Sequence, residues 1–336
     1  MTSPKPYTPS FAPLVLDPTA EVERITGWMR ERLRVDLRKR GLVIGLSGGI
    51  DSSLCAALAV RALGAKGVFA LFMPENDSDP ESLRLGRTVA ETFGIESVVE
   101  DIGPSLAAMG CYERRNTFIR TDVPEFEANW GSKIVFDNAM TTGGYNISSL
   151  VVRSPKGETR KVRLSANAYL GIVAATNMKQ RTRKQLEYYH ADRLNFAVIG
   201  TPNLLEYDQG FFVKNGDGAA DIKPIAHLYK SQVYQLAAHL GVPAEILSRP
   251  PTTDTYSLPQ TQEEFYFALP YGKMDICLYG LEYALPAATI AAETGLKESD
   301  VELIWMDIAA KRKVARYLHC PPLVLAVTNR VMARSR

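Results

Sequence analysis

The segment 41–53, with the sequence GLVIGLSGGIDSS, constrains the fold of this chain more than any other. Its apolar residues 42–46 predict a buried strand, the Ser47-Gly48-Gly49 run predicts a tight turn, and a helix-forming run begins at Leu54. A glycine turn between a strand and a helix N-terminus directs backbone N–H groups and the helix dipole toward an anion. Asp51 adds a hard oxygen ligand suited to Mg²⁺. We therefore expect a phosphate-binding loop, although a tight turn that uses glycine without binding is the simpler alternative.

The loop differs from two common nucleotide-binding motifs. It has no lysine at the head of its helix, as a Walker A loop would, and it lacks the G-x-G-x-x-G spacing of a Rossmann fold. Apolar strands and helical stretches alternate along the chain, which predicts an α/β fold with a doubly wound parallel sheet and flanking helices. In such a sheet the ligand crevice lies at the C-terminal ends of the strands, where Ser47 and Thr201 fall. The expected strands are 42–46, 67–73, 95–99 and 196–200, and the expected helices include 80–93 and 166–190.

We expect one domain over residues 19–320, preceded by a Pro-rich arm at 1–18 that wraps the surface or a partner subunit, and followed by a tail at 321–336. Residues 111–165 interrupt the alternation of strands and helices. Alternating apolar residues with Gly and Pro-Lys-Gly turns predict a β-hairpin insertion of one or two hairpins there.

Composition excludes several functional classes. The net charge of +2 gives no tendency toward nucleic acid, and no apolar run approaches the length of a membrane span. The N-terminus has no apolar core of a secretory signal, so a cytoplasmic location is expected. The four cysteines are far apart and the four histidines form no ligand pattern, so reduced thiols and no zinc site are expected.

The loop Ser47–Ser52 resembles the pyrophosphate loop of the N-type ATP pyrophosphatases, also called adenine nucleotide alpha hydrolase-like proteins. Beyond the loop, residues 17–315 resemble the synthetase domain of NAD⁺ synthetases. The resemblance is carried by four segments in order and spacing: 177–183 (NMKQRTR), 200–206 (GTPNLLE), 210–218 (GFFVKNGDG) and 221–225 (DIKPI).

The resemblance implies a role for each matching residue. Asp51 and Glu206 would bind Mg²⁺, and Asp51 and Lys214 would be catalytic. The residues implied to bind ATP are Gly45, Leu46, Ser47, Gly48, Gly49, Ile50, Asp51, Ser52, Thr201, Lys230 and Thr252. The residues implied to bind the acid substrate are Arg181, Lys214, Asp221 and Lys311. Because Arg181 and Arg183 lie two residues apart on one helix, they do not share a face and should serve different partners.

The implied reaction activates the carboxylate of deamido-NAD⁺ by transfer of AMP from ATP, after which ammonia displaces AMP. Charge that redistributes on the phosphates requires Mg²⁺ and fixed lysines, so positioning and electrostatics would provide most of the catalysis. Only about forty residues precede the loop, too few for a glutaminase domain. Free ammonia is therefore the expected nitrogen donor. The family resemblance also implies a homodimer with the substrate across the interface.

Two other functions fit parts of the sequence. An amide ligase of the same fold could adenylate a different acid, since Ala310 stands where the family usually has a histidine and 111–165 is inserted. A catalytically silent binding or regulatory homologue is the alternative of another class. The presence of Asp51, Glu206, Lys214 and Lys230 argues against it, because a decayed site would have lost some of them.

Overall fold

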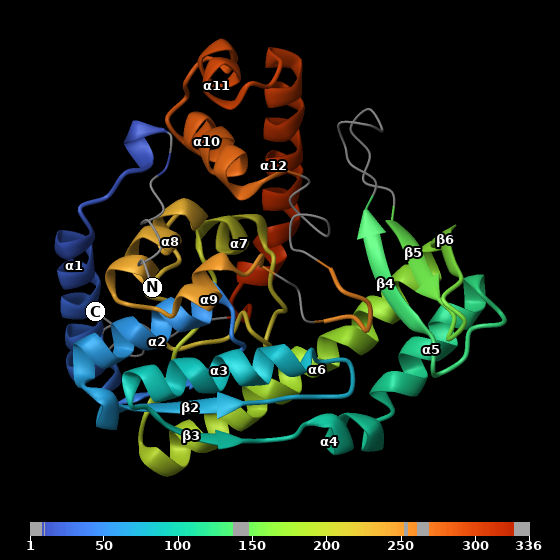
Figure 1. Cartoon of the computed structure of the whole chain (residues 1–336), viewed down its shortest axis with the longest axis horizontal. Coiled ribbons are helices and arrows are strands. Elements are labelled where there is room, and N and C mark those ends of the chain that lie inside the picture. Colours follow the sequence, from blue (N-terminus) through green and yellow to red (C-terminus); the bar gives the residue numbers. More distant parts are fainter. Residues whose placement is uncertain (1–8, 10, 137–147, 252–254, 261–268, 326–336) are drawn as a thin grey trace.

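The computed structural model describes residues 9, 11–136, 148–251, 255–260 and 269–325 (Figure 1). Its centre is a four-stranded sheet in the order β3-β2-β1-β7, in which every neighbouring pair is parallel. The strands are β1 (Leu42–Gly45), β2 (Val68–Phe72), β3 (Glu96–Val99) and β7 (Ala197–Val198). The predicted parallel α/β sheet is thus confirmed. The strand expected at 196–200 is shorter than predicted, since Ile199 makes only an isolated bridge to Ile222.

Helices cover both faces of this sheet, and the alternation of side chains along β1 explains why. Leu42 and Ile44 pack into one apolar core with α1 (Pro18–Glu31), α2 (Ile50–Leu63), α3 (Pro80–Phe93) and α8 (Lys230–His239). Val43, between them, points to the opposite face and packs into a second core with residues of β2, α4 (Gly103–Ala108) and α6 (Ala166–Leu194). A strand buried on both faces is apolar at successive positions, as this one is.

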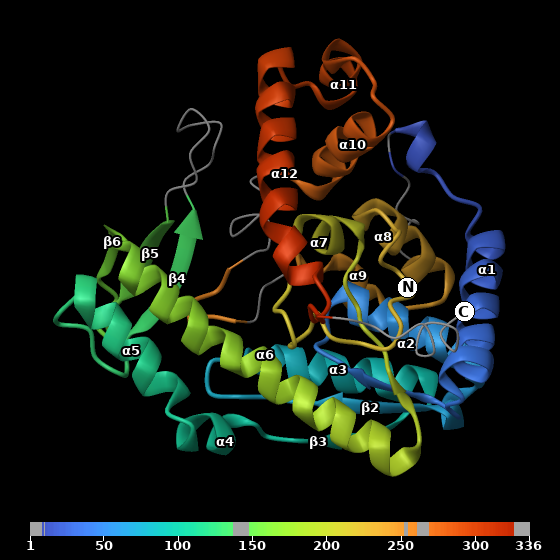
Figure 2. The same ribbon diagram turned by 180° about the vertical axis from the view of Figure 1, so that it is seen from behind.

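Helix α6 crosses one face of the sheet and continues to a second, antiparallel sheet, and in Figure 2 it lies in front of β2 and β3. It begins at Ser165, whose side chain accepts a hydrogen bond from the Ala168 N–H, and ends at Asn195, which adopts the left-handed conformation. Ser and Asn are typical of these two helix termini. The helix extends four residues beyond the predicted end at 190.

Residues 111–165, the predicted insertion, contain more than the predicted hairpins. Helix α5 (Cys111–Asp122) comes first and packs along α6. An antiparallel sheet of β4 (Gly131–Phe136), β5 (Ser148–Arg153) and β6 (Thr159–Arg163) follows. The hairpin prediction therefore holds for the strands and missed α5, whose Cys111 is buried in the core that β1 and β2 share with α6.

The remaining helices follow β7 in the chain. They are α7 (Leu204–Gln209), α9 (Ala244–Ser248), α10 (Tyr271–Glu282), α11 (Ala287–Thr294) and α12 (Glu298–His319). A π-helical turn (Arg32–Leu37) follows α1, and 3₁₀ turns occupy Ala12–Leu14 and Ala65–Gly67.

The described part of the N-terminal arm packs on its own chain. Phe11 meets the Tyr279 ring edge-to-face, and the Gln235 side chain bonds to the backbone of Leu14 and Leu16. No helix in the described ranges is both long enough and apolar enough to span a membrane.

Candidate active site

A cavity of about 1040 Å³ opens at the C-terminal ends of β1 and β2. The predicted loop forms its floor, the inner face of α6 forms one wall, and the C-terminal half of α12 forms another. Residues 249–251 and 255–256 contribute to the rest of the lining, together with parts of 71–83 and 201–217. The ligand crevice therefore lies where the parallel sheet predicts it. All eight predicted loop residues line it: Gly45, Leu46, Ser47, Gly48, Gly49, Ile50, Asp51 and Ser52.

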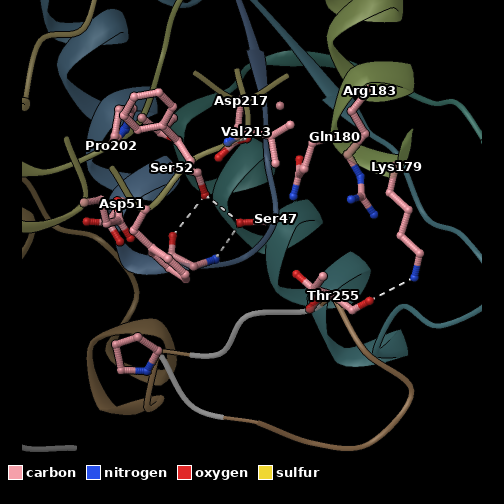
Figure 3. Close-up of a pocket in the computed structure, with 18 of the residues that line it drawn as sticks. Ser47, Asp51, Ser52, Lys179, Gln180, Arg183, Pro202, Val213, Asp217 and Thr255 are labelled. Atoms are coloured by element: carbon pink, nitrogen blue, oxygen red, sulfur yellow. Dashed lines mark hydrogen bonds between the residues drawn. The ribbon is translucent and has the colours of Figure 1, made fainter. Parts of the chain in front are cut away.

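The loop requires glycine at one position for two reasons. Gly48 has a φ of +71°, and a Cβ there would lie 2.7 Å from the Leu85 Cβ of helix α3. The loop is then tied to the start of α2, because the Ser52 and Ser53 hydroxyls donate to the Gly49 carbonyl at 3.0 and 2.8 Å. The Ser47 and Ser52 hydroxyl oxygens lie 3.3 Å apart at the cavity floor (Figure 3). The α2 N-terminus, which favours negative charge, thus faces the cavity.

Two acidic residues and a buried lysine lie beside this loop. Asp51, in the first turn of α2, pairs with the Nζ of Lys230, which is fully buried at the start of α8. Burial opposes the charge on Lys230, yet the carboxylates of Asp51 and Glu206 outweigh it and raise the pKa of that lysine. Burial and the nearby charge of Asp51 together raise the pKa of Glu206 to about 8. The predicted residues Asp51, Glu206 and Lys230 are therefore brought together in one electrostatic unit.

Asn203 connects these groups and was missed by the sequence analysis. Its side chain caps α7 by accepting from the Glu206 N–H at 3.2 Å, and Glu206 in turn accepts from the Asn203 N–H at 3.2 Å. The Asn203 amide also donates to Asp51 at 3.0 Å. The signal was present in the sequence, since Asn followed three residues later by Glu is a capping box. Thr201, three residues after β7, lines the cavity next to this unit.

Helix α6 directs Arg181 and Arg183 to different places. Arg183 lines the cavity and donates from Nε to the Met73 carbonyl at the end of β2, at 3.1 Å. Arg181 lies on the exposed side of the helix and donates to the Lys214 carbonyl at 3.3 Å. The two side chains therefore do not share a face of α6, as expected, and the partners that they serve stay a prediction.

The other predicted substrate residues are divided between the cavity and this outer face. Lys311 lines the cavity beside Ala310 and pairs with Asp307 at 2.7 Å. Lys214 lies outside it and donates from Nζ to the carbonyls of Tyr317 and Cys320, each at 2.7 Å. Asp221 accepts from the Val198 N–H at 2.7 Å and from the Tyr188 hydroxyl at 3.4 Å. Thr252 falls outside the described residues. The roles of all the predicted site residues, those in the cavity included, remain predictions.

A second charged cluster at the cavity was not foreseen. Lys179, on the inner face of α6, pairs with Glu75 and Asp77, which follow β2. Asp77 is also paired with Arg115 of α5. Burial alone would raise the pKa of the Asp77 carboxyl, but the charges of Lys179 and Arg115 outweigh burial and lower it. Further along α6, Lys184 pairs with Glu187 at 2.6 Å. Glu187 lines the cavity and lies close to Gly45.

Comparison with known proteins adds an independent line of evidence. The family model described as NAD synthase matches residues 21–123 and 140–316. An NH(3)-dependent NAD(+) synthetase of Rhizobium meliloti (strain 1021) is 69% identical over 309 residues, which cover 92% of each chain. Among solved structures, the NMN synthetase from Francisella tularensis gives a TM-score of 0.64 at 24% identity, covering 92% of this chain and 99% of that one. The NH3-dependent NAD synthetase from Campylobacter jejuni, in complex with nitrate, gives 0.59 at 24% identity, covering 93% and 100%. These two structures support the fold alone.

Proposed function

Because the chain belongs to the NAD synthase family, we propose that it is an ammonia-dependent NAD⁺ synthetase. It would convert deamido-NAD⁺, ATP and ammonia to NAD⁺, AMP and pyrophosphate. The observation that carries this proposal is the phosphate-binding loop with the Asp51–Lys230–Glu206 unit at its side, inside a cavity large enough for a nucleotide.

The reaction has two chemical steps. A carboxylate oxygen of deamido-NAD⁺ attacks the α-phosphorus of ATP, and the bond to the β-phosphate oxygen breaks to release pyrophosphate. Ammonia then attacks the acyl carbon, AMP leaves with the bonding electrons, and a proton is lost. The N-terminus of α2 and the loop N–H groups would receive the leaving pyrophosphate. Lys230 provides a fixed positive charge beside the same loop.

The residues at the loop also fit a divalent cation. Asp51 and Glu206 are hard oxygen donors that repel each other in a buried place, as the raised pKa of Glu206 indicates. Within the described ranges, no cluster of three His, Cys, Asp or Glu side chains could bind a metal unaided. Two carboxylates completed by phosphate and water oxygens are typical of Mg²⁺ sites in nucleotide enzymes. Bound there, Mg²⁺ would neutralise charge on the phosphates.

The positions of the expected substrate residues support an extended dinucleotide site. Lys311 lies in the cavity, whereas Arg181, Lys214 and Asp221 lie near the outer side of α6. A small acid would not reach both places, but a dinucleotide could extend from one to the other. The outer part of this proposed site is exposed, which is consistent with our expectation of a homodimer in which the partner covers the outer side of α6.

The nitrogen donor and the acid can be tested in one assay. We would incubate the enzyme with ATP, MgCl₂ and deamido-NAD⁺, supply either ammonium or glutamine, and quantify NAD⁺ and AMP by mass spectrometry. The proposal predicts equal amounts of NAD⁺ and AMP with ammonium, and little of either with glutamine. Formation of AMP without NAD⁺, or dependence on glutamine, would contradict it.

A further inference from the structure

Residues 255–260, called here the 255–260 wall because the segment begins at the cavity, are attached to two different elements of the protein. On one side, Thr255 meets the inner face of α6 through Lys179, as Figure 3 shows. On the other, residues 257–260 lie along strand β4. Thr255 and Tyr256 themselves line the cavity. Both attachments therefore act on a segment that shapes the proposed nucleotide site.

Lys179 uses all three of its hydrogens in this attachment. Its Nζ donates to Glu75 at 3.0 Å, to Asp77 at 2.6 Å and to the Thr255 carbonyl at 2.9 Å. Lys179 is 1% exposed, so water does not compete for these bonds. With Arg115 also paired to Asp77, the cluster contains two positive and two negative charges. Such a balanced, fully bonded group is rigid, whereas a buried charge lacking a partner would be costly.

Strand β4 provides the second attachment through backbone and side-chain bonds. The Ser132 N–H donates to the Ser257 hydroxyl at 2.9 Å, and the Leu258 N–H donates to the Ser132 carbonyl at 3.3 Å. The Gln260 amide donates to the Ile134 carbonyl at 2.5 Å. The segment thus follows β4 much as an additional strand would.

Residues 124–139, which contain β4, lie outside the ranges matched by the family model. The second attachment is therefore built from a part of this chain that the general family pattern does not include. Strand β4 therefore contacts a segment that borders the cavity and is not confined to the periphery of the protein.

We propose that Lys179 and strand β4 together fasten the 255–260 wall and thereby set the affinity of the cavity for ATP. Lys179 acts here as a positioning residue, and the inference rests on the proposed function for the identity of the nucleotide. A fastened wall is already in its binding position, so no binding energy is used to order it. When only a fraction of molecules has the wall in place, the apparent dissociation constant rises by the inverse of that fraction.

The test must separate positioning from general stability, because Lys179→Met alone leaves a buried carboxylate without its partner. The double variant Lys179→Met/Glu75→Gln removes one charge of each sign and so keeps the cluster neutral. It still lacks the donor to the Thr255 carbonyl. Ser257→Ala weakens the other attachment without touching a charge. Arg120→Gln is the matched control, since Arg120 bonds the Phe126 carbonyl and Glu113 in the same region and forms none of the bonds described above.

ATP would be titrated with MgCl₂ into each variant by calorimetry, and kcat and the thermal midpoint measured in parallel. We expect the double variant to regain most of the wild-type thermal midpoint while binding ATP about tenfold more weakly, the effect of losing one bond to a charged donor. Ser257→Ala should weaken ATP binding about threefold. Lys179→Arg should restore most of the affinity, and Arg120→Gln should bind as wild type. Ser257 does not line the cavity, so kcat of Ser257→Ala should stay within about twofold.

Wild-type affinity in the neutral double variant would overturn the inference, as would a loss of affinity in Arg120→Gln equal to that in Ser257→Ala. Because ATP binding is measured directly, a failure of the wild type to make NAD⁺ would contradict the proposed function and leave this test intact.

Discussion

Lys230 gives the sharpest test of the electrostatics beside the phosphate-binding loop. Its side chain is fully buried, its Nζ pairs with Asp51, and its charge also acts on Glu206. Lys230→Met leaves two carboxylates facing each other without that cation. Removing one partner of a buried ion pair costs about 3–5 kcal/mol. The Asp51 side chain is 15% exposed and Glu206 can take up a proton near neutral pH, so we expect the low end, about 3 kcal/mol.

The assay is urea unfolding at pH 7 without nucleotide and at fixed protein concentration, with turnover measured separately. The charge-balanced variant Lys230→Met/Asp51→Asn is the control and should recover about half of the lost unfolding free energy. Both variants should lose at least about 100-fold in turnover, because the fixed charge at the phosphates is gone. A loss below about 1 kcal/mol in the single variant, typical of an exposed pair, would refute the reasoning.

Three further predictions concern neighbouring residues. Glu206→Gln should reduce Mg²⁺-dependent turnover by at least about 100-fold. The pKa of Glu206 is about 8 in the folded protein and 4.5 in the unfolded chain, so its contribution to stability is present below pH 4.5 and is lost as the pH rises through 8. In urea unfolding, the variant should therefore gain stability over wild type between pH 5 and 9. Gly48→Ala should lower the unfolding free energy by about 2 kcal/mol, because the alanine would combine a φ of +71° with a Cβ 2.7 Å from Leu85. Gly49→Ala should lower it less, since Gly49 has a φ of −84° and its Cβ would lie 3.3 Å from the nearest atom. Equal thermal midpoints of the two variants would contradict this. Burial raises the pKa of Asp275 to about 6, although its carboxylate accepts from the Lys230 and Ser231 N–H groups. The unfolding free energy of Asp275→Asn should therefore rise relative to that of wild type as the pH rises from 4 to 6. A pH-independent difference between the two would exclude that shift.

Local patterns in the sequence were sufficient to predict the centre of the fold. The strand, glycine turn and helix at 42–63 follow from contiguous residues, and the parallel sheet follows from the alternation of strands and helices. The loop residues reached the cavity for the same reason, because the end of a parallel strand fixes where its turn must lie. Helix α5 was missed because its sequence, CYERRNTFIRTD, shows little amphipathic pattern.

Interactions between distant segments could not be predicted in this way. Lys179 bonds Glu75 and Thr255, which lie 104 and 76 residues away along the chain, so nothing near it in the sequence indicates those partners. Lys214 likewise bonds carbonyls at the end of α12, and backbone carbonyls carry no residue-specific signal. A motif predicts which residues are present, whereas the tertiary fold decides which of them meet.

The fate of the carboxylate oxygen tests the proposed chemistry most directly. We would supply deamido-NAD⁺ labelled with ¹⁸O in its carboxylate, together with ATP, MgCl₂ and ammonium, and analyse the products by mass spectrometry. Attack of that carboxylate on the α-phosphorus, followed by displacement of AMP, predicts one ¹⁸O in the phosphate of AMP for each NAD⁺ formed. Unlabelled AMP, or label in pyrophosphate or phosphate, would contradict an acyl-adenylate and with it the central account of this site.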